Sequence, residues 1–470
     1  MDSSVHDPAD DDVDAAIEPA ADDRSYRTEP YLDTDQVPSV DELMQQAARS
    51  AGITTATRPP AETPPGDDGD HDLPTRDADD GADDERKPHF WQRRPKTTIA
   101  IAIVLLLLIY PTATYVAALR KPGNESLEAR TAEWARDMKL GFAVDWLEQR
   151  HFAEDQFVQG GTPDATAFEV AGQTTPSSMA TTTSITIPHS KPPTRMASPV
   201  NPPNAGEGEW IPIGPQPKGI PGVYVTKVRP DTTHTSLTLF AAWIDPKLTD
   251  IVLHPGTDLP GGEWATPHQI PAERCASAVM ASNGFFRMDQ ARGGYYAEGR
   301  EPFKLRDGAA SFVIMKDGSV DVVQWGREYG RDKLDSIASV RQNLQLLVDN
   351  GQPTPSTKDD TDWGAKLPNV YFMWRSGYGV TADGALVYVG GPALTPFDLA
   401  TALVNAGAVK AMEGDINPEW VTAILVSDTG NGCTGQKALG GPENTGGMRA
   451  PDDRYLETDT RDFVAVYAKP

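Results

Sequence analysis

The sequence is poor in cysteine and lacks the short motifs of several enzyme classes. It has two cysteines in 470 residues and no Cys-x-x-Cys pair or Cys/His cluster, which argues against a structural zinc site. It contains no Gly-x-Gly-x-x-Gly and no P-loop, so nothing points to a dinucleotide or nucleotide site of those types. No repeat recurs at a solenoid period. Basic side chains are outnumbered by acidic ones, 42 to 68, and do not cluster with aromatic residues, which argues against nucleic-acid binding.

What is abundant is acidity, and it is concentrated near the N-terminus. Residues 1–85 carry 25 acidic and 5 basic side chains, a net charge of −20, out of −26 for the whole chain. This stretch is rich in Asp, Pro and Ala, and its scattered apolar residues cannot bury enough surface to offset the entropy of ordering. We therefore predict a disordered acidic tail over residues 1–96. A short helix over 40–51 would be a docking site for a protein partner, and a transient helix in a solvated tail is the alternative.

Residues 97–119 are predicted to form a single transmembrane helix. The run holds 23 uncharged residues, mostly apolar, which is enough to cross ~30 Å of hydrocarbon. Pro111 within it is tolerated in a membrane helix. A buried soluble helix is disfavoured by the length and the missing charges. A cleaved signal peptide is disfavoured because the run lies far from the start and has no good cleavage pattern.

Basic residues set the expected orientation. Five precede the run closely and three follow it: Arg86, Lys87, Arg93, Arg94 and Lys96, then Arg120, Lys121 and Arg130. The excess on the N-terminal side predicts a cytoplasmic tail and an extracytoplasmic C-terminal part. An even number of cysteines in that compartment permits one disulfide, Cys275–Cys433, worth roughly 4–5 kcal/mol by the chain-entropy model. Two unrelated buried thiols are the alternative.

Three segments are expected after the membrane. The first is a juxtamembrane amphipathic helix, predicted over residues 120–158 and capped by Asn124 or Ser126. Its apolar face would pack on the protein's own domain or on lipid, and an oligomeric stalk is the alternative. Residues 159–207 are rich in Pro, Ser and Thr and predict an extended linker. From 208 to 470, short β-type runs alternate with turns and helical pattern is scarce. We predict one α+β domain with mixed β-sheets and few helices.

Residues 371–420 hold the most informative pattern of the C-terminal part. Two runs rich in aromatic and β-branched residues flank Asp383-Gly384, which predicts a hairpin. Thr395 then suits an N-cap, with a helix from Pro396 that ends at Gly407. The apolar run 408–412 predicts a buried strand that opens onto polar residues. Polar groups beyond a strand's carboxyl end are typical of ligand sites in α/β sheets.

This part of the chain resembles the phosphodiester glycosidase family, which includes the lysosomal uncovering enzyme and many bacterial envelope proteins. The resemblance spans roughly residues 208–470 and rests on segments in the family's order. These segments are Ser282–Phe286 (SNGFF), Leu346–Gly351 (LLVDNG), Arg375, Gly379-Val380, Asp383-Gly384 and Gly407-Ala408. One element departs from the family pattern. Where the family has Asp-Gly-Gly-Gly-Ser, this chain has residues 415–419 (DINPE), so Ile416 and Pro418 replace glycines that let backbone amides approach a substrate.

The resemblance implies a hydrolase that cleaves the bond between an anomeric carbon and a phosphate oxygen. Such a reaction needs a carboxylate, a positioned water and a cation for the phosphate. Arg375 is the candidate for the phosphate, with a strand-surface salt bridge as the alternative. Asp415 and Glu413 are the candidate catalytic carboxylates. In an extended strand they would share one face with Asn417, a candidate substrate-binding residue, and would raise one another's pKa. A turn capped by Asp415 and Asn417 is the alternative.

Three further residues are candidates for sugar binding. By family position, Asn283 and Gly284 would contact the sugar, with a simple tight turn as the alternative. Tyr295, in the polar segment 287–298, would stack on a sugar ring. We expect no cofactor or metal; Ca²⁺ would suit alternate acidic residues, but Pro418 stands where a calcium loop needs glycine.

Two functional hypotheses follow. The first is a membrane-anchored hydrolase in the plasma membrane of a bacterium, cleaving a sugar-phosphate diester of the cell envelope. Its partners would be the membrane, the envelope glycan substrate and a cytoplasmic protein bound to the tail. The alternative is a catalytically inactive protein that binds envelope glycan or acts as a scaffold through its acidic tail.

Overall fold

The computed structural model describes residues 108–154, 157–170, 188–216, 219–359, 362–364, 372–441 and 446–470. The predicted acidic tail and residues 97–107 of the predicted membrane span lie outside these ranges, and residues 108–119 are helical. Within the described ranges, no helix is both long enough and apolar enough to cross a membrane.

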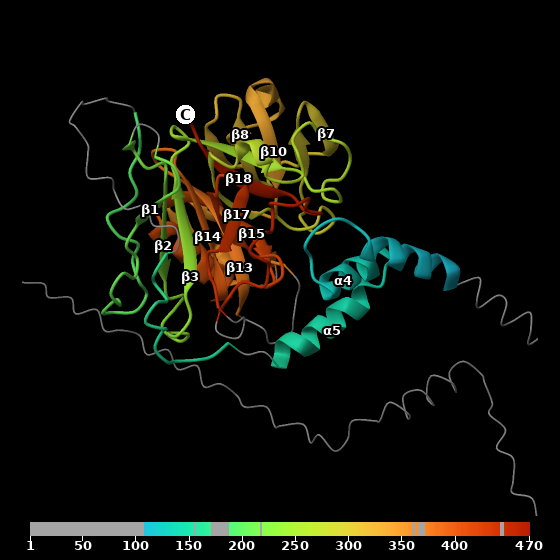
Figure 1. Ribbon diagram of the computed structural model, residues 1–470, viewed down its shortest axis with the longest axis horizontal. Coiled ribbons are helices and arrows are strands. Elements are labelled where there is room, and N and C mark those ends of the chain that lie inside the picture. Colours follow the sequence, from blue (N-terminus) through green and yellow to red (C-terminus); the bar gives the residue numbers. More distant parts are fainter. Residues whose placement is uncertain are drawn as a thin grey trace, which may run out of the picture. The chain divides into compact units, whose positions relative to one another are not determined.

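Short strands rich in β-branched and aromatic residues build most of the C-terminal part, which confirms the prediction of a mostly β structure with few helices. The largest sheet has eight strands in the order β1-β2-β3-β14-β13-β15-β11-β12. Their bounds are Ile211–Ile213, Val223–Val228, Leu239–Ile244, Leu386–Leu394, Met373–Thr381, Ala408–Ile416, Leu346–Asp349 and Gln352–Pro353. Figure 1 shows β2, β3, β14 and β13 side by side in this order.

Two smaller sheets have five strands each. One has the order β17-β16-β5-β18-β4, with bounds Cys433–Lys437, Ala423–Asp428, Ala278–Asn283, Phe463–Ala468 and Thr249–His254. The other has the order β7-β6-β10-β8-β9, with bounds Arg300–Phe303, Tyr295–Ala297, Ile337–Gln342, Ala310–Met315 and Val320–Gln324. Among the described residues every pair of named strands is antiparallel, and parallel pairing is limited to two isolated bridges.

The three sheets share one apolar core. Phe240 and Tyr378 of the large sheet, Met280 and Val464 of the second sheet, and Phe312 of the third belong to the same buried cluster. The opposite face of the large sheet is covered by α6 (Pro396–Asn405), whose apolar side chains form a second cluster with that sheet. The strands that carry the candidate site are therefore covered on both faces.

The helix α6 forms as the sequence predicts. Thr395 accepts a hydrogen bond from the backbone N–H of Asp398, and the Asp398 carboxylate accepts one from the N–H of Thr395, a capping box. Pro396 occupies the first turn, and Gly407 follows the helix with a φ of +103°. The predicted hairpin also forms, between β13 and β14, with Gly384 at a φ of +86°.

Two helices, not one, follow the predicted membrane span: α4 (Leu127–Asp137) and α5 (Gly141–Glu154). The Ser126 side chain caps α4 by accepting the N–H of Ala129. The helix ends because Lys139 adopts a left-handed φ of +64° and the N–H of Leu140 bonds the carbonyl of Ala135 at 2.8 Å. These contacts are those of a Schellman motif, which breaks the single helix that the periodicity predicts.

The segment 159–207 lies on the domain where it is described, which differs from the extended spacer that its composition predicts. Met196 is buried in the cluster beneath α6, and Val170 is buried in the shared core. Glu207 is fully buried and accepts hydrogen bonds from Arg229, the shortest at 2.8 Å. Single apolar and charged residues thus attach this segment to the β domain. The overall Pro, Ser and Thr content of the segment gives no sign of these contacts.

Three 3₁₀ helices complete the described elements: η3 (Ala272–Arg274), η4 (Arg331–Ser336) and η5 (Pro355–Lys358). Just after η3, Cys275 forms a disulfide with Cys433 at the start of β17, which confirms the predicted bond. The bond attaches the edge strand β17 to the segment that leads into β5.

Candidate active site

Strand β15 carries the predicted carboxylates and extends four residues further than its apolar pattern suggests. The sequence predicts a strand that ends at Met412, whereas β15 continues to Ile416. Its pairing with β13 shifts between Arg375, which lies opposite Ile416, and Gly377, which lies opposite Glu413. This irregularity interrupts the simple alternation of side chains, so Glu413 and Asp415 have different surroundings.

Glu413 and Arg375 form a buried ion pair. Arg375 Nη1 donates to Glu413 Oε1 at 2.6 Å, and its other contacts are the carbonyls of Leu394 and Trp363. Both side chains are at most 4% exposed. Burial raises the pKa of Glu413 to about 7, although the neighbouring guanidinium opposes the shift. Neither residue lines the polar cavity that opens beside Asp415.

Asp415 lies at the cavity. Its Oδ2 accepts a hydrogen bond from Arg461 Nη1 at 2.7 Å, and its Oδ1 accepts the backbone N–H of Ile416 at 2.8 Å. Burial raises the pKa of Asp415 to about 7, and Arg461 opposes that shift. A carboxyl group with a pKa near 7 exists in both protonation states at neutral pH, which suits acid–base chemistry.

Asn417 also lines the cavity but serves a turn. It has a φ of +94°, its Oδ1 accepts the N–H of Glu419 at 2.9 Å, and its carbonyl accepts the N–H groups of Trp420 and Val421. Asp415 and Asn417 both accept hydrogen bonds from neighbouring backbone amides. This is the capped turn that the sequence analysis gives as the alternative to a catalytic role for Asp415. The second carboxylate oxygen of Asp415, Oδ2, accepts the hydrogen bond from Arg461.

Asn283 connects three strands beside this site. Its Nδ2 donates to Ser376 Oγ and to the Gly284 carbonyl, and its Oδ1 accepts from Tyr388 Oη and the N–H of Thr422. These four bonds use the two donors and two acceptors of the amide. Asn283 is 5% exposed, and protein groups fill the hydrogen-bonding capacity that a sugar would need.

Gly284 and Gly414 are required by close approach. A Cβ on Gly284 would lie 2.4 Å from the Asp462 carbonyl oxygen, and one on Gly414 would lie 2.6 Å from Ser376 Oγ. Ser376 Oγ also accepts the N–H of Asp415 at 3.0 Å. The hydroxyl thus connects Asn283 to β15, so two of the predicted site segments lie together.

Tyr295 lies apart from this group. It is fully buried in β6, its ring centroid is 5.5 Å from that of Trp264, and its hydroxyl has no hydrogen-bond partner among the described residues. Burial raises the pKa of the phenol. The side chain does not line the cavity that contains Asp415, and it belongs to the core that the three sheets share.

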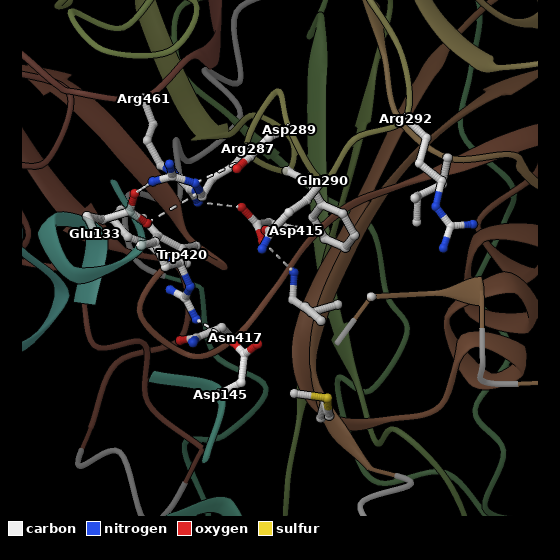
Figure 2. A pocket seen from close by; sticks show the side chains of 16 residues that line it. Glu133, Asp145, Arg287, Asp289, Gln290, Arg292, Asp415, Asn417, Trp420 and Arg461 are labelled. Atoms are coloured by element: carbon white, nitrogen blue, oxygen red, sulfur yellow. Dashed lines mark hydrogen bonds and ion pairs between the residues drawn. The ribbon is translucent and has the colours of Figure 1, made fainter. Parts of the chain in front are cut away.

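A polar cavity of about 320 Å³ opens beside Asp415. Figure 2 shows Asp415, Arg461 and Glu133 turned toward one another, with Arg287 and Trp420 next to them. The Arg461 guanidinium lies over the Trp420 ring, 4.0 Å from its centroid, which fixes the arginine between the ring and Asp415. The site therefore combines a carboxyl group of raised pKa, four lining arginines and the ring of Trp420.

Four arginines line this cavity, Arg136, Arg287, Arg292 and Arg461, and the sequence predicted none of them as site residues. Arg461 is a lone basic residue just before β18, and no motif marks it. Arg287 lies at the start of the polar segment 287–298, in which Tyr295 is the predicted sugar contact, and the polarity of this segment is the one signal near it. Arg461 contacts Asp415 and Arg287 lines the same cavity, because Arg287 follows β5, Arg461 precedes β18, and these two strands are neighbours in the second sheet.

The described residues contain no group of three or more His, Cys, Asp or Glu side chains placed to hold a metal ion. The Asp415 oxygens contact Arg461 and a backbone amide, and Glu413 contacts Arg375. In this arrangement each carboxylate is neutralised by an arginine.

Comparison with known proteins gives distant structural likeness. No protein-family model matches the chain, and no curated protein matches it. One similar solved structure is the catalytic domain of zebrafish N-acetylglucosamine-1-phosphodiester alpha-N-acetylglucosaminidase, auto-inhibited by its pro-peptide. It is 14% identical, with a TM-score of 0.35, and the match covers 53% of this chain and 82% of that one.

Two other solved structures are similar to the same extent or less. A hypothetical protein from Synechocystis is 12% identical, with a TM-score of 0.28, over 53% of this chain and 62% of that one. An exported protein from Burkholderia pseudomallei is 11% identical, with a TM-score of 0.23, over 49% and 74%. At these identities and TM-scores the similarity is one of distant fold and assigns no activity to this chain.

Proposed function

We propose that this chain is a hydrolase that cleaves a sugar-1-phosphodiester of the bacterial cell envelope. The ordered resemblance of residues 208–470 to phosphodiester glycosidases motivates the reaction class. The observation that carries the proposal is Asp415, a carboxyl group with a pKa raised to about 7 at the edge of a polar cavity lined by arginines.

The reaction places modest demands on such a site. The departing phosphate is a weak base, so its oxygen needs little protonation as the bond to the anomeric carbon breaks. Water attacks the anomeric carbon, the phosphate leaves with the bonding electron pair, and the water's proton passes to Asp415 and then to solvent. The carboxylate also stabilises the positive charge that develops on the sugar ring.

The other predicted residues support Asp415 in this proposal. Arg375 and Glu413 form the buried pair that holds β15 against β13, and Asn283 and Gly284 hold β5 beside them. These four are positioning residues in the described arrangement. Asn417 shapes the cavity rim, and Tyr295 stabilises the core.

Turnover of defined substrates tests the proposal. The purified full-length protein is incubated with a panel of sugar-1-phosphodiesters, and release of free sugar is followed. We expect Asp415→Asn to lower the rate by about 100-fold or more, as expected for loss of a general acid–base group. Asp321→Asn is the matched control, since burial also raises the pKa of Asp321 but it does not line the cavity. Equal rates of sugar release in the wild type and both variants would exclude a catalytic role for Asp415.

A second candidate function is glycan binding without catalysis. Ile416 and Pro418 stand where the family has glycines, and Asp415 and Asn417 make the contacts of a capped turn. Two results together would favour this function over hydrolysis. The Asp415→Asn variant would still bind an envelope glycan, and the wild-type protein would release no product from any phosphodiester.

The proposed location is the bacterial plasma membrane, with residues 97–119 as a single-pass anchor, the acidic tail in the cytoplasm and the β domain outside. The support is the uncharged run and the basic residues before it. In this location the tail would bind a cytoplasmic protein partner. Protease added to intact cells should cut the segments around the β domain and spare the tail; the reverse pattern would invert the orientation.

A further inference from the structure

Two cavities meet at the same pair of arginines. Besides the cavity that contains Asp415, a second one of about 350 Å³ lies between α4, the segment before it and the second sheet. Both cavities are lined by Arg287, Arg461, Trp420 and Glu133. The arginine side chains come from the β domain, whereas Glu133 comes from α4.

The carboxylates of α4 neutralise these arginines. Glu133 Oε2 contacts Arg287 Nη1, and Asp137 Oδ1 accepts a hydrogen bond from Arg287 Nη2 at 2.8 Å. Glu133 Oε1 lies 3.7 Å from Arg461 Nη2. Asp289 is a third carboxylate at Arg287, with its Oδ1 3.3 Å from Arg287 Nε. Burial lowers the pKa of Arg287, the Asp289 charge raises it, and the nearby Arg461 charge lowers it. Two like charges held this close favour an anion between them.

The fit between α4 and the arginines is incomplete. Glu133 Oε1 and Arg461 Nε are both buried, and neither has a hydrogen-bond partner among the described residues. The separation of 3.7 Å is too long for a hydrogen bond. A carboxylate has two oxygens in a plane, whereas a phosphate presents oxygens in three dimensions and can bond both guanidinium groups.

Polar contacts hold α4 and the segment before it on the β domain. Lys121 bonds Asp258 at 2.6 Å, the Ser126 N–H bonds Glu419, and Glu125 accepts from Thr460. Within α4 itself, Ala129 is the one residue with a buried side chain, and Leu127 is 63% exposed. Lys121 and Asp258 are 39% and 38% exposed, and an ion pair this exposed contributes little to stability.

We propose that Arg287 and Arg461 form a phosphate-binding site, which α4 closes by placing Glu133 and Asp137 in it. A phosphate-bearing ligand that enters the site displaces the two carboxylates and releases α4 from the cavity edge. The inference deepens the proposed function and rests on it only for the identity of the natural ligand, a sugar phosphodiester.

Binding of inorganic phosphate tests the site without requiring turnover. Titration calorimetry on the full-length protein compares wild type with the double variant Glu133→Gln/Asp137→Asn. We expect the double variant to bind phosphate at least about 10-fold more tightly, since the competing carboxylates are gone. Glu128→Gln removes an exposed charge from the same helix and is the matched control, with binding as in wild type. Arg287→Gln should abolish binding, even though it also frees α4.

Amide hydrogen exchange separates the possible outcomes. Saturating phosphate should increase exchange in α4 of wild type and leave α6 unchanged. Equal phosphate affinity in wild type and double variant, or unchanged exchange in α4, would overturn the displacement. Absence of phosphate binding in all the proteins would overturn the site itself. A protein that binds phosphate through Arg287 but hydrolyses no phosphodiester would leave this inference standing and refute the proposed function alone.

Discussion

Two of the arginine–carboxylate pairs in this part of the chain have different surroundings. Arg375 and Glu413 belong to adjacent strands of the large sheet and are at most 4% exposed. Arg287 and Glu133 connect a loop of the domain to α4 and are 11% and 24% exposed. The first pair is enclosed between a sheet and a helix, whereas the second faces two cavities. The contrast indicates that the enclosed pair fixes the structure and that the pair at the cavities can exchange its carboxylate for a ligand.

The largest expected effect comes from breaking the enclosed pair. Arg375→Ala would leave Glu413 buried without its cation, which should lower the free energy of unfolding by about 3–5 kcal/mol. Chemical denaturation of the full-length protein followed by near-ultraviolet circular dichroism measures this change. Arg331→Ala, which removes an exposed partner of Glu301, should leave the transition close to that of wild type. Similar transitions for the two variants would mean that the enclosed pair is not structural.

The pH dependence of stability sharpens the comparison. The pKa values of Glu413 and Asp415 are raised from about 4 to about 7, so the folded state binds more protons than the unfolded state in this window. Their contribution to stability is therefore present at low pH and is lost as pH rises through about 7. Relative to wild type, Glu413→Gln should remove part of the loss in melting temperature between pH 5 and pH 8. If the melting temperature of Glu413→Gln changed with pH as that of wild type does, the raised pKa of Glu413 would be contradicted.

A smaller effect on stability is expected at the cavity pair. Arg287→Ala should lower the free energy of unfolding by less than Arg375→Ala does, because Glu133 and Asp137 are 24% and 55% exposed and can turn into water once the arginine is gone. The same denaturation experiment measures it, and hydrogen exchange should show α4 opening more often. A loss as large as that of Arg375→Ala would show that α4 is a fixed part of the fold.

The smallest change needs no substitution. Raising the salt concentration from 0.1 to 1 M shortens the screening length from ~10 to ~3 Å, which weakens exposed ion pairs more than enclosed ones. Exchange in α4 should increase, whereas exchange in α6 should not, since the buried Leu399 and Leu403 hold α6 to the sheet. Equal responses of both helices would show that α4 is held as firmly as α6.

Much of the local structure around the site could be predicted because its signals are local. The Thr395 cap, Pro396 and Gly407 predict α6 to within two residues at its C-terminal end, since each acts on the backbone next to it. Asp383-Gly384 fixes the hairpin for the same reason. The strand after α6 was predicted too short because Glu413 and Asp415 are polar, and their arginine partners are distant in sequence.

The sequence by itself determined the mostly β architecture, the capped helix α6, the hairpin before it and the pairing of its two cysteines. Each depends on a short pattern or on a small set of alternatives. The tertiary structure alone decided that Arg375 is enclosed, that Asn283 bonds to protein, and that Arg287, Arg461 and Glu133 meet beside Asp415. Those contacts join residues up to 328 positions apart, from Glu133 to Arg461, and only the packing of strands and helices brings such residues within hydrogen-bonding or ionic distance.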